Sequence, residues 1–319
     1  YDFMSFKGVF LPGIKFGKTK SINFGYIFRI FFFKGVIINA NPISITGFMI
    51  SLFSRLLNKR YYIEGDGAFI KTESKLFFYL KRNMLKGANL YFSTNDSHKE
   101  YYLHYGIKLN QIVEYPFTSV SQSDIITKPL TYDEKKRLKN KLSLPDAFNI
   151  LFIGQFIDRK GIPTLIKIAT EIPDAFVTMI GGSEKDFEDY LSTKNLVRPP
   201  NIIVRGFKSR EEIFTFYQAC DVFILPSLED IWGLVINEAI SQGMPVISSK
   251  SCGAAERLIM ENHNGFTFRN KEIDDLIVKL RQLQSSDEFR LKMSNCSIEI
   301  ASKYTFETMV DAHIKHLKK

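Results

Sequence analysis

The chain has 319 residues, a length that suits two ordinary domains, and its 45% hydrophobic content excludes a disordered protein. Its formal net charge of +9 is unevenly divided. Residues 1–147 contain 22 Lys and Arg against 11 Asp and Glu, whereas residues 148–319 contain 21 against 23. The basic first part predicts an anionic partner, such as a membrane surface, a lipid-phosphate acceptor or nucleic acid, and the alternative is an ordinary solvated surface.

Short apolar segments alternate with amphipathic ones along the first half of the chain. The apolar segments predict strands at 36–40, 60–64, 89–93 and 111–115. The segments between them predict helices at 45–57, 73–86 and 97–105.

Residues 22–38 form the most apolar stretch of the chain. Because Arg29 and Lys34 interrupt it, the stretch does not predict a transmembrane helix. We interpret it as a core helix followed by the first of these strands. The alternative is a helix lying in a membrane interface, with the two cations near lipid head groups.

The second half shows a clearer alternation. β-branched runs predict strands, buried on both faces, at 149–153, 176–180, 202–204, 222–225 and 245–248, each followed by a helical pattern. A charged segment at 128–147 predicts a surface helix that joins the two halves. Repeated βα units imply parallel sheets with right-handed crossovers, so we expect an α/β chain with two Rossmann-like domains facing a cleft.

The first motif that carries chemistry lies at 226–239, where the sequence reads PSLEDIWGLVINEA. It predicts the end of a buried strand, an acidic loop with Gly233, and the start of a helix. A helix N-terminus offers N–H donors and partial positive charge to a phosphate. The nearby acids Asp230, in the loop, and Glu238, which we place in the first turn of the helix, can accept hydrogen bonds from sugar hydroxyls. Acids that only stabilise a helix dipole are the alternative.

The second motif, GQFIDRKG at 154–161, follows the first strand of the second half. Gly154 permits close approach of the backbone to a ligand. Lys160 stands just before a predicted helix, where it can contact a diphosphate, and Arg159 can add a guanidinium. A merely polar loop is the alternative.

These motifs resemble those of family 4 retaining glycosyltransferases of the GT-B fold, particularly bacterial capsular and exopolysaccharide enzymes. The family pattern E-x-F-G-L-V-x-x-E-A corresponds to DIWGLVINEA at 230–239, and G-R-L-x-x-x-K-G corresponds to 154–161. The first Glu is replaced by Asp230, with Glu229 one residue earlier, so either acid can take that role. Gln155 replaces the family's Arg, and Arg159 can compensate. The family's usual length implies that the N-terminal domain is truncated here.

The resemblance implies three segments and a set of site residues. The segments are an incomplete acceptor-side domain at 1–147, a nucleotide-sugar domain at 148–303, and a helix at 304–319 that crosses back to the first domain. Lys160, Arg159, Asp230 and Glu238 are the implied catalytic residues. The implied donor-binding residues are Gly154, Gln155, Gly206, Phe207, Glu229, Trp232, Gly233, Leu234, Gly253 and Glu256.

In the first domain, Glu64-Gly65-Asp66-Gly67 follows a predicted strand, at the kind of strand end where open α/β sheets bind ligands. Asp66 occupies the neighbourhood of a family His and is a fifth candidate catalytic residue. The alternative is a turn in which Asp is favoured for local reasons.

We therefore expect a metal-independent hexosyltransferase that needs no cofactor and uses a UDP- or GDP-linked sugar. The acceptor is a glycan or a polyprenyl-diphosphate-linked glycan of cell-surface polysaccharide synthesis, and no nucleic acid is involved. Three scattered cysteines without metal spacing suit the cytoplasm, with peripheral attachment to the inner face of the plasma membrane as an option. The alternatives are a degenerate GT-B protein that binds without turnover and, less favoured, a sugar-nucleotide epimerase.

Overall fold

The computed structural model describes residues 13–16, 20–23, 25–39, 44–270 and 272–317. The chain divides into two compact units, residues 1–115 and 116–319. The boundary between the units lies at 115/116, earlier in the chain than the expected 147/148, because residues 116–147 pack with the second unit. In helix α5 (Tyr132–Lys141), for example, Lys139 pairs with Asp221 at 2.8 Å. Helix α13 (Phe306–Leu317) also falls in the second unit, and its predicted crossing back to the first domain stays a prediction.

The first unit contains a sheet of four parallel strands in the order β3–β4–β5–β6. Its strands are β3 (Gly35–Asn39), β4 (Arg60–Glu64), β5 (Leu90–Ser93) and β6 (Ile112–Glu114). The helices between them are α2 (Ile45–Leu56), α3 (Lys75–Leu85) and α4 (Asp96–His104), with the 3₁₀ turn η1 at Leu109–Gln111. All these helices and strands were predicted to within two residues at each end.

Because strand order follows chain order, right-handed crossovers place α2, α3 and α4 on one face of this sheet. The core beneath them is rich in tyrosine, with Tyr61, Tyr91, Tyr102 and Tyr105 fully buried. Buried tyrosine needs a partner for its hydroxyl. Tyr61 and Tyr91 donate to the backbone carbonyls of Lys86 and Leu85.

The structure of residues 22–38 agrees only in part with our favoured interpretation of a core helix followed by a strand. It holds the end of a short antiparallel hairpin, β1 (Gly13–Phe16) with β2 (Lys20–Asn23), then the five-residue helix α1 (Tyr26–Ile30) and strand β3. Tyr26 and Ile30 are buried, as a core helix requires. Phe31, Phe32 and Phe33, however, form an exposed turn. Residue 24 and the side chains of residues 27 and 28 lie outside the described part of the chain.

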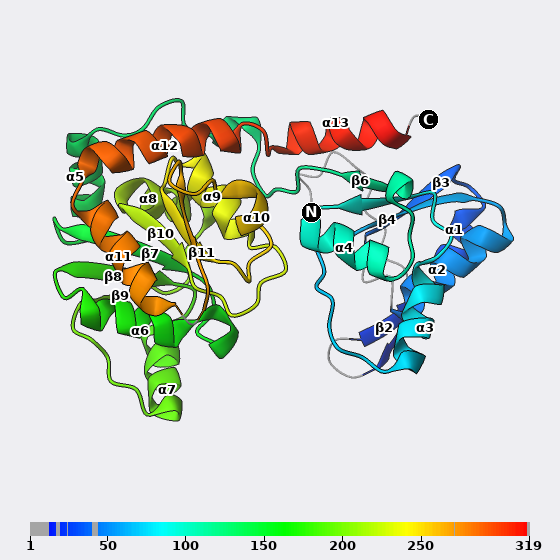
Figure 1. The fold of residues 1–319 in the computed structure, drawn as a ribbon, viewed down its shortest axis with the longest axis horizontal. Coiled ribbons are helices and arrows are strands. Elements are labelled where there is room, and N and C mark those ends of the chain that lie inside the picture. The colour runs from blue at the N-terminus through cyan, green and yellow to red at the C-terminus, as the bar shows by residue number, and fades with distance from the viewer. Residues whose placement is uncertain (1–12, 17–19, 24, 40–43, 271, 318–319) are drawn as a thin grey trace. The chain divides into compact units, whose positions relative to one another are not determined.

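The second unit contains six parallel strands in the order β12–β11–β10–β7–β8–β9. Figure 1 labels β7 to β11. They are β7 (Phe148–Ile153), β8 (Ala175–Ile180), β9 (Ile202–Val204), β10 (Val222–Leu225), β11 (Val246–Ser249) and β12 (Gly265–Phe268). The first five were predicted. We had interpreted 264–266 only as a structural turn, whereas Gly265 begins β12.

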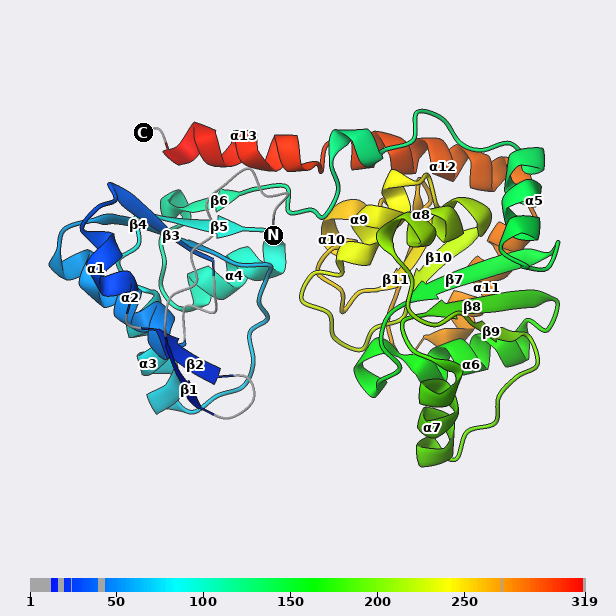
Figure 2. The ribbon, with the colours of Figure 1, turned by 180° about the vertical axis from the view of Figure 1, so that it is seen from behind.

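Helices cover both faces of this sheet (Figures 1 and 2). On one face α6 (Ile162–Glu171) contacts α11 (Ile273–Gln284), and on the other α9 (Leu234–Ser241) contacts α8 (Arg210–Ala219) and α12 (Asp287–Ala301). The shorter or peripheral elements are η2 (Gln122–Asp124), η3 (Asp158–Lys160), α7 (Glu184–Lys194) and α10 (Ala255–Leu258). Strands β7 and β10 are buried throughout, as expected of a doubly covered sheet. The predicted α/β class with two Rossmann-like domains is confirmed.

Candidate functional site

The strand order of the second unit reverses between β7 and β10. From β7 the chain continues outward to β8 and β9, whereas from β10 it continues in the opposite direction to β11 and β12. In open α/β sheets, ligands bind outside the carboxyl ends of the strands at such a switch point. The two loops that leave this point are the two motifs of the sequence, residues 154–161 after β7 and 226–233 after β10.

The β7 loop is pressed against the β10 loop. Gly161, which has φ of +74° and caps helix α6, lies where a Cβ atom would stand 1.9 Å from the carbonyl oxygen of Pro226. Only glycine combines that backbone conformation with so close an approach. The Leu228 amide also donates to the Arg159 carbonyl at 2.8 Å. The 3₁₀ turn of residues 158–160 is thereby held beside the acidic loop.

Lys160 and Asp230 form the central contact of the site. Lys160 Nζ lies 2.5 Å from Asp230 Oδ2, and both side chains are largely buried, at 15% and 12% exposure. Arg159 is more exposed; its Nη1 donates to the Glu229 carbonyl at 3.0 Å and lies 3.9 Å from Asp230 Oδ1. Two cations and a carboxylate therefore meet at the switch point.

The backbone of Asp230 fixes the loop that follows β11. Its amide donates to the Ser251 carbonyl, and its carbonyl accepts from the Gly253 amide, both at 3.0 Å. Gly253 is buried in this pairing, whereas Glu256, in the first turn of the four-residue helix α10, is exposed. Residue 230 thus joins the β10 and β11 loops, while its side chain reaches the β7 loop.

Helix α9 begins at this point. Its N-cap is Gly233, with φ of +95° and no room for a Cβ because Cys252 Sγ would lie 2.6 Å away. Leu234, the first helical residue, is 37% exposed. The first-turn N–H groups of a helix lack intrahelical partners and carry partial positive charge. This terminus can therefore receive an anion.

Glu238 lies in the second turn of α9, not in the first turn as we predicted, because the helix begins only at Leu234. One carboxylate oxygen accepts from Ser119 Oγ and the other from the Tyr217 hydroxyl, each at 3.3 Å. Burial raises the pKa of Glu238 above its usual value, against the lowering effect of the Tyr217 hydrogen bond and the charge of Arg210. The carboxylate is held by two hydroxyl donors in a partly buried position.

The sequence did not indicate the residues that hold Glu238. Ser119 lies on the segment before η2, and Arg210 clamps that segment by donating to the Ser119 carbonyl and to both oxygens of Asp124. Burial raises the pKa of Asp124, but hydrogen bonds from Arg210 and Ser121 outweigh it and bring the value to about 2. No linear spacing relates these residues to Glu238, so the sequence carried no signal for them.

Trp232, predicted to bind the donor, is a core residue. It is 2% exposed, its Nε1 donates to Asn237 Oδ1 at 2.8 Å, and its ring meets the edge of Phe117. Asn237 in turn donates to the Phe117 carbonyl. We therefore assign Trp232 a packing role that fixes the loop between Asp230 and α9.

Four predicted donor-binding residues lie in the loops at neighbouring strand ends. Gly154 donates its amide to the Ile180 carbonyl, and Gly181, after β8, donates to the Gly206 carbonyl. Gly206 has φ of +54° with open space where a Cβ would lie, and Phe207 beside it is 78% exposed. Gln155 is also exposed. These loops leave an aromatic ring and an amide accessible at the same end of the sheet.

Asp66, the remaining candidate, belongs to the first unit. It is exposed in the loop after β4. The Tyr115 hydroxyl donates to the Gly65 carbonyl at 3.0 Å, and a Cβ at Gly65 would stand 3.6 Å from the His98 ring. Burial lowers the pKa of His98 to about 3, so this imidazole is neutral at physiological pH. A neutral, packed ring and a tyrosine thus support the Asp66 loop.

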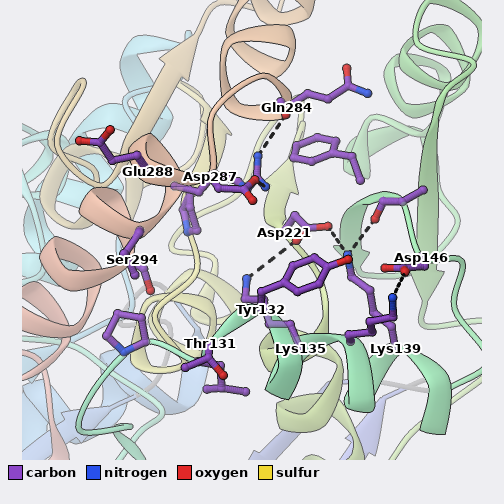
Figure 3. A pocket seen from close by; sticks show the side chains of 18 of the residues that line it. Thr131, Tyr132, Lys135, Lys139, Asp146, Asp221, Gln284, Asp287, Glu288 and Ser294 are labelled. Carbon is purple, nitrogen blue, oxygen red and sulfur yellow. Dashed lines mark hydrogen bonds and ion pairs between the residues drawn. The ribbon is translucent and has the colours of Figure 1, made fainter.

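A separate cavity of about 690 Å³ lies at the opposite, amino end of the second unit's sheet (Figure 3). Several of its charged groups are paired with one another. Lys139 pairs with Asp221 at 2.8 Å, Lys136 pairs with Asp146 at 2.8 Å, and Lys135 donates to the Cys220 carbonyl. These pairs attach α5 to the strand ends, so we assign them a structural role and place the candidate site at the carboxyl ends.

Comparison with known proteins agrees with this geometry. Residues 134–299, which are 166 of the 319 residues, match the glycosyl transferases group 1 family. The chain belongs to this family. Both motifs of the candidate site fall within the matched region.

The chain is similar to several glycosyltransferases. An uncharacterized glycosyltransferase of Methanocaldococcus jannaschii is 28% identical over 162 residues, covering 50% of this chain and 45% of that protein. An N,N'-diacetylbacillosaminyl-diphospho-undecaprenol alpha-1,3-N-acetylgalactosaminyltransferase of Campylobacter jejuni is 22% identical, covering 72% of this chain and 60% of that protein. The chain spans about half the length of the curated relatives it matches.

The fold of this group 1 chain also matches solved structures. The Anabaena protein Alr3699/HepE, solved in complex with UDP, superimposes with a TM-score of 0.78 at 16% identity, covering 92% of this chain and 80% of that one. At this identity the likeness shows the fold alone. Together with the two parallel sheets, it confirms the expected GT-B architecture.

Proposed function

We propose that this group 1 family member is a glycosyltransferase that moves a hexose from a nucleotide-sugar to a glycan or lipid-linked acceptor in cell-surface polysaccharide synthesis. The observation that carries the proposal is the meeting of Lys160, Arg159 and Asp230 at the switch point, beside the N-terminus of α9. A diphosphate needs cations and N–H donors, and a sugar needs a carboxylate acceptor. The site offers both within one pair of loops.

The proposed chemistry is leaving-group stabilisation. When a nucleotide-sugar loses its nucleoside diphosphate, negative charge grows on the β-phosphate oxygen while the sugar carbon becomes oxocarbenium-like. Lys160, Arg159 and the α9 N-terminus would bind that growing charge more tightly in the transition state than in the ground state. In this scheme Lys160 exchanges its contact with Asp230 for one with phosphate, and no metal ion is required.

The remaining candidates have roles in holding the donor. We propose that Asp230 or Glu229 accepts hydrogen bonds from sugar hydroxyls and that Glu238 accepts from the ribose. Gly206 and Phe207 suit contact with the base, since a glycine backbone and an exposed aromatic ring both favour a flat ligand. Gly154, Gln155, Gly233, Leu234, Gly253 and Glu256 line the same strand ends. Asp66 would contact the sugar or the acceptor hydroxyl.

The donor base and acceptor are also proposals. The UDP complexes of the Anabaena protein and the diphospho-undecaprenol acceptor in the name of the Campylobacter enzyme favour a uridine donor and a polyprenyl-diphosphate-linked acceptor. Such an acceptor implies a location at the cytoplasmic face of the membrane. Within the described residues, no helix has both the length and the apolarity to cross a bilayer.

A transfer assay tests the proposal. We expect release of nucleoside diphosphate from UDP- or GDP-hexoses in the presence of lipid-linked oligosaccharide, unaffected by EDTA, with the product anomer matching the donor anomer by NMR. Asp230→Ala should abolish release. Nucleotide binding without any release would instead favour the degenerate binding protein, for which the neutral Gln155 at the family's Arg position is the motivating observation. An inverted anomer would contradict the retaining mechanism.

A further inference from the structure

Exposed apolar side chains are concentrated in one region of the first unit. Of the large hydrophobic residues exposed in the described chain, 14 lie in residues 1–115 and 13 in the much longer remainder. Eleven of those 14 fall on the α1–α2–α3 region, and the other three lie in β3, α4 and η1. Phe32 is 85% exposed, Leu56 70% and Leu76 69%. This distribution sets the region apart from the rest of the surface.

Helix α2 is reversed relative to an ordinary amphipathic helix. Its buried residues are Gly47, Ser51 and Ser54, which follow one another by four and three positions and so share a stripe. Ile45, Leu52 and Leu56 are exposed, and at 100° per residue they lie on the opposite side of the helix. Glycine and serine therefore occupy the buried side of α2, whereas Ile45, Leu52 and Leu56 face outward.

Helix α3 continues this pattern. Leu76, Tyr79 and Leu80 are 48–69% exposed. Because Tyr79 and Leu80 follow Leu76 by three and four positions, the three side chains share one outward stripe. The two helices contact each other and cover the same face of the sheet (Figure 1). The turn of residues 31–33 is tied to the end of α2, because Lys59 Nζ donates to the carbonyls of Phe33 at 3.1 Å and Phe31 at 3.4 Å. We define the α2–α3 face as Leu52, Leu56, Leu76, Tyr79, Leu80 and residues 31–33.

The segment that carries the α2–α3 face is rich in basic residues. Residues 29–86 contain ten Lys and Arg but only three acids. Of these acids, Glu64 is buried and Glu73 is engaged by Lys81 and Tyr105. Lys34, Arg55, Arg60 and Lys75 are exposed. The segment that forms the face therefore carries a strong positive charge.

We infer that the α2–α3 face docks on an anionic lipid bilayer, with its phenylalanine turn and leucines in the head-group region and its cations on lipid phosphates. Interfacial binding needs this combination of apolar burial and basic charge. A second copy of the chain fits less well, since pairing the face with itself would bring two strongly positive surfaces together. The inference deepens the proposed function and rests on it for the lipid-linked acceptor, which such docking would bring within reach. Docking itself does not require the nucleotide site.

Co-sedimentation with vesicles tests this inference. We expect the full chain to bind vesicles of phosphatidylcholine mixed with phosphatidylglycerol, to bind pure phosphatidylcholine much less, and to lose binding as salt screens the charges. Phe32→Ser with Leu56→Ser should weaken binding about tenfold or more, since each removes a side chain that would be buried. Lys34→Glu with Lys75→Glu should do the same.

Matched controls lie on the second unit. Val197→Ser replaces a side chain that is 83% exposed, and Lys292→Glu reverses an exposed charge, so neither should alter vesicle binding. Equal vesicle binding by the face variants and these controls would overturn the inference. So would concentration-dependent dimerisation that Phe32→Ser abolishes, or capture of an acidic protein in place of vesicles. Nucleotide binding measured on the same samples separates failure of docking from failure of the proposed function.

Discussion

Lys160 Nζ lies 2.5 Å from Asp230 Oδ2, and this ion pair links the loops after β7 and β10 through two residues that are 70 positions apart in the chain. Since Asp230 also bonds through its backbone to Ser251 and Gly253, the side chain of Lys160 is positioned relative to three strand ends. From this position the flexible side chain of Lys160 can exchange its contact with Asp230 for one with a phosphate oxygen by side-chain rotation. The pair is thus both a structural link and the proposed start of the leaving-group site.

Lys160→Ala should weaken nucleoside diphosphate binding about ten- to a hundredfold, because a charge-assisted hydrogen bond contributes about 1.5–3 kcal/mol. It should also lower the free energy of unfolding by about 1–3 kcal/mol, because Asp230 is left largely buried without its cation. Calorimetry and urea unfolding measure the two effects. Lys292→Ala, an exposed-pair control, should change neither, and unchanged nucleotide affinity in Lys160→Ala would contradict the assigned role.

Glu238 should make stability and binding depend on pH in opposite ways. Burial raises its pKa in the folded chain, so the folded state favours the protonated acid. The associated stability is fully present below the unfolded pKa and is lost as pH rises through the raised folded value. Ribose binding, by contrast, needs the carboxylate and should weaken as pH falls through that value.

Glu238→Gln tests both effects. Urea unfolding of the variant should lose this part of the pH dependence, and its stability near neutral pH should equal or exceed that of the original chain. Its nucleotide affinity should be lower and flat with pH over the same interval. A variant that keeps full affinity for nucleotides would show that Glu238 does not contact the ribose.

Tyr217→Phe should raise the pKa of Glu238 further, because the tyrosine hydroxyl donates to the carboxylate and lowers its pKa. The pH at which nucleotide binding weakens should move upward, with a stability loss of about 1 kcal/mol. Tyr61→Phe removes a comparable hydroxyl in the first unit and should leave the binding profile unchanged. Identical profiles for all three proteins would refute the positioning of Glu238 by Tyr217.

Gly161→Ala should be severely destabilising, by about 3 kcal/mol or more, because its Cβ would meet the Pro226 carbonyl oxygen in a left-handed backbone. Gly206→Ala is the matched comparison. It also has a positive φ but open space around it, so a cost of about 1 kcal/mol is expected. Equal losses in thermal unfolding would show that the two loops are not pressed together.

Much of the architecture could be predicted because the strands of the second unit are short β-branched runs, which differ clearly from the amphipathic helical segments between them. Strand β12 was missed because Asn264-Gly265 is a strong turn signal in front of only four residues. The β1–β2 hairpin was missed for a similar reason, since its strands are also four residues long.

The candidate site could be predicted only where its residues are close in sequence. Asp230 and Lys160 were found from their loops, but their direct contact was not predicted. Ser119, Arg210 and Tyr217 reach Glu238 from separate elements, and no pattern connects them. The faces of α2 also run against periodicity, because a helical stripe of large apolar residues is ordinarily buried, whereas the buried stripe of α2 holds Gly47, Ser51 and Ser54.

Calorimetric titration of the chain with UDP, GDP and ADP tests the central claim most directly. The account predicts one saturable site in the micromolar range for one of these nucleotides, greatly weakened by Lys160→Ala and retained in Lys292→Ala. Absence of binding to all three, in protein that unfolds cooperatively in urea, would contradict the claim that the loops after β7 and β10 hold a nucleotide diphosphate.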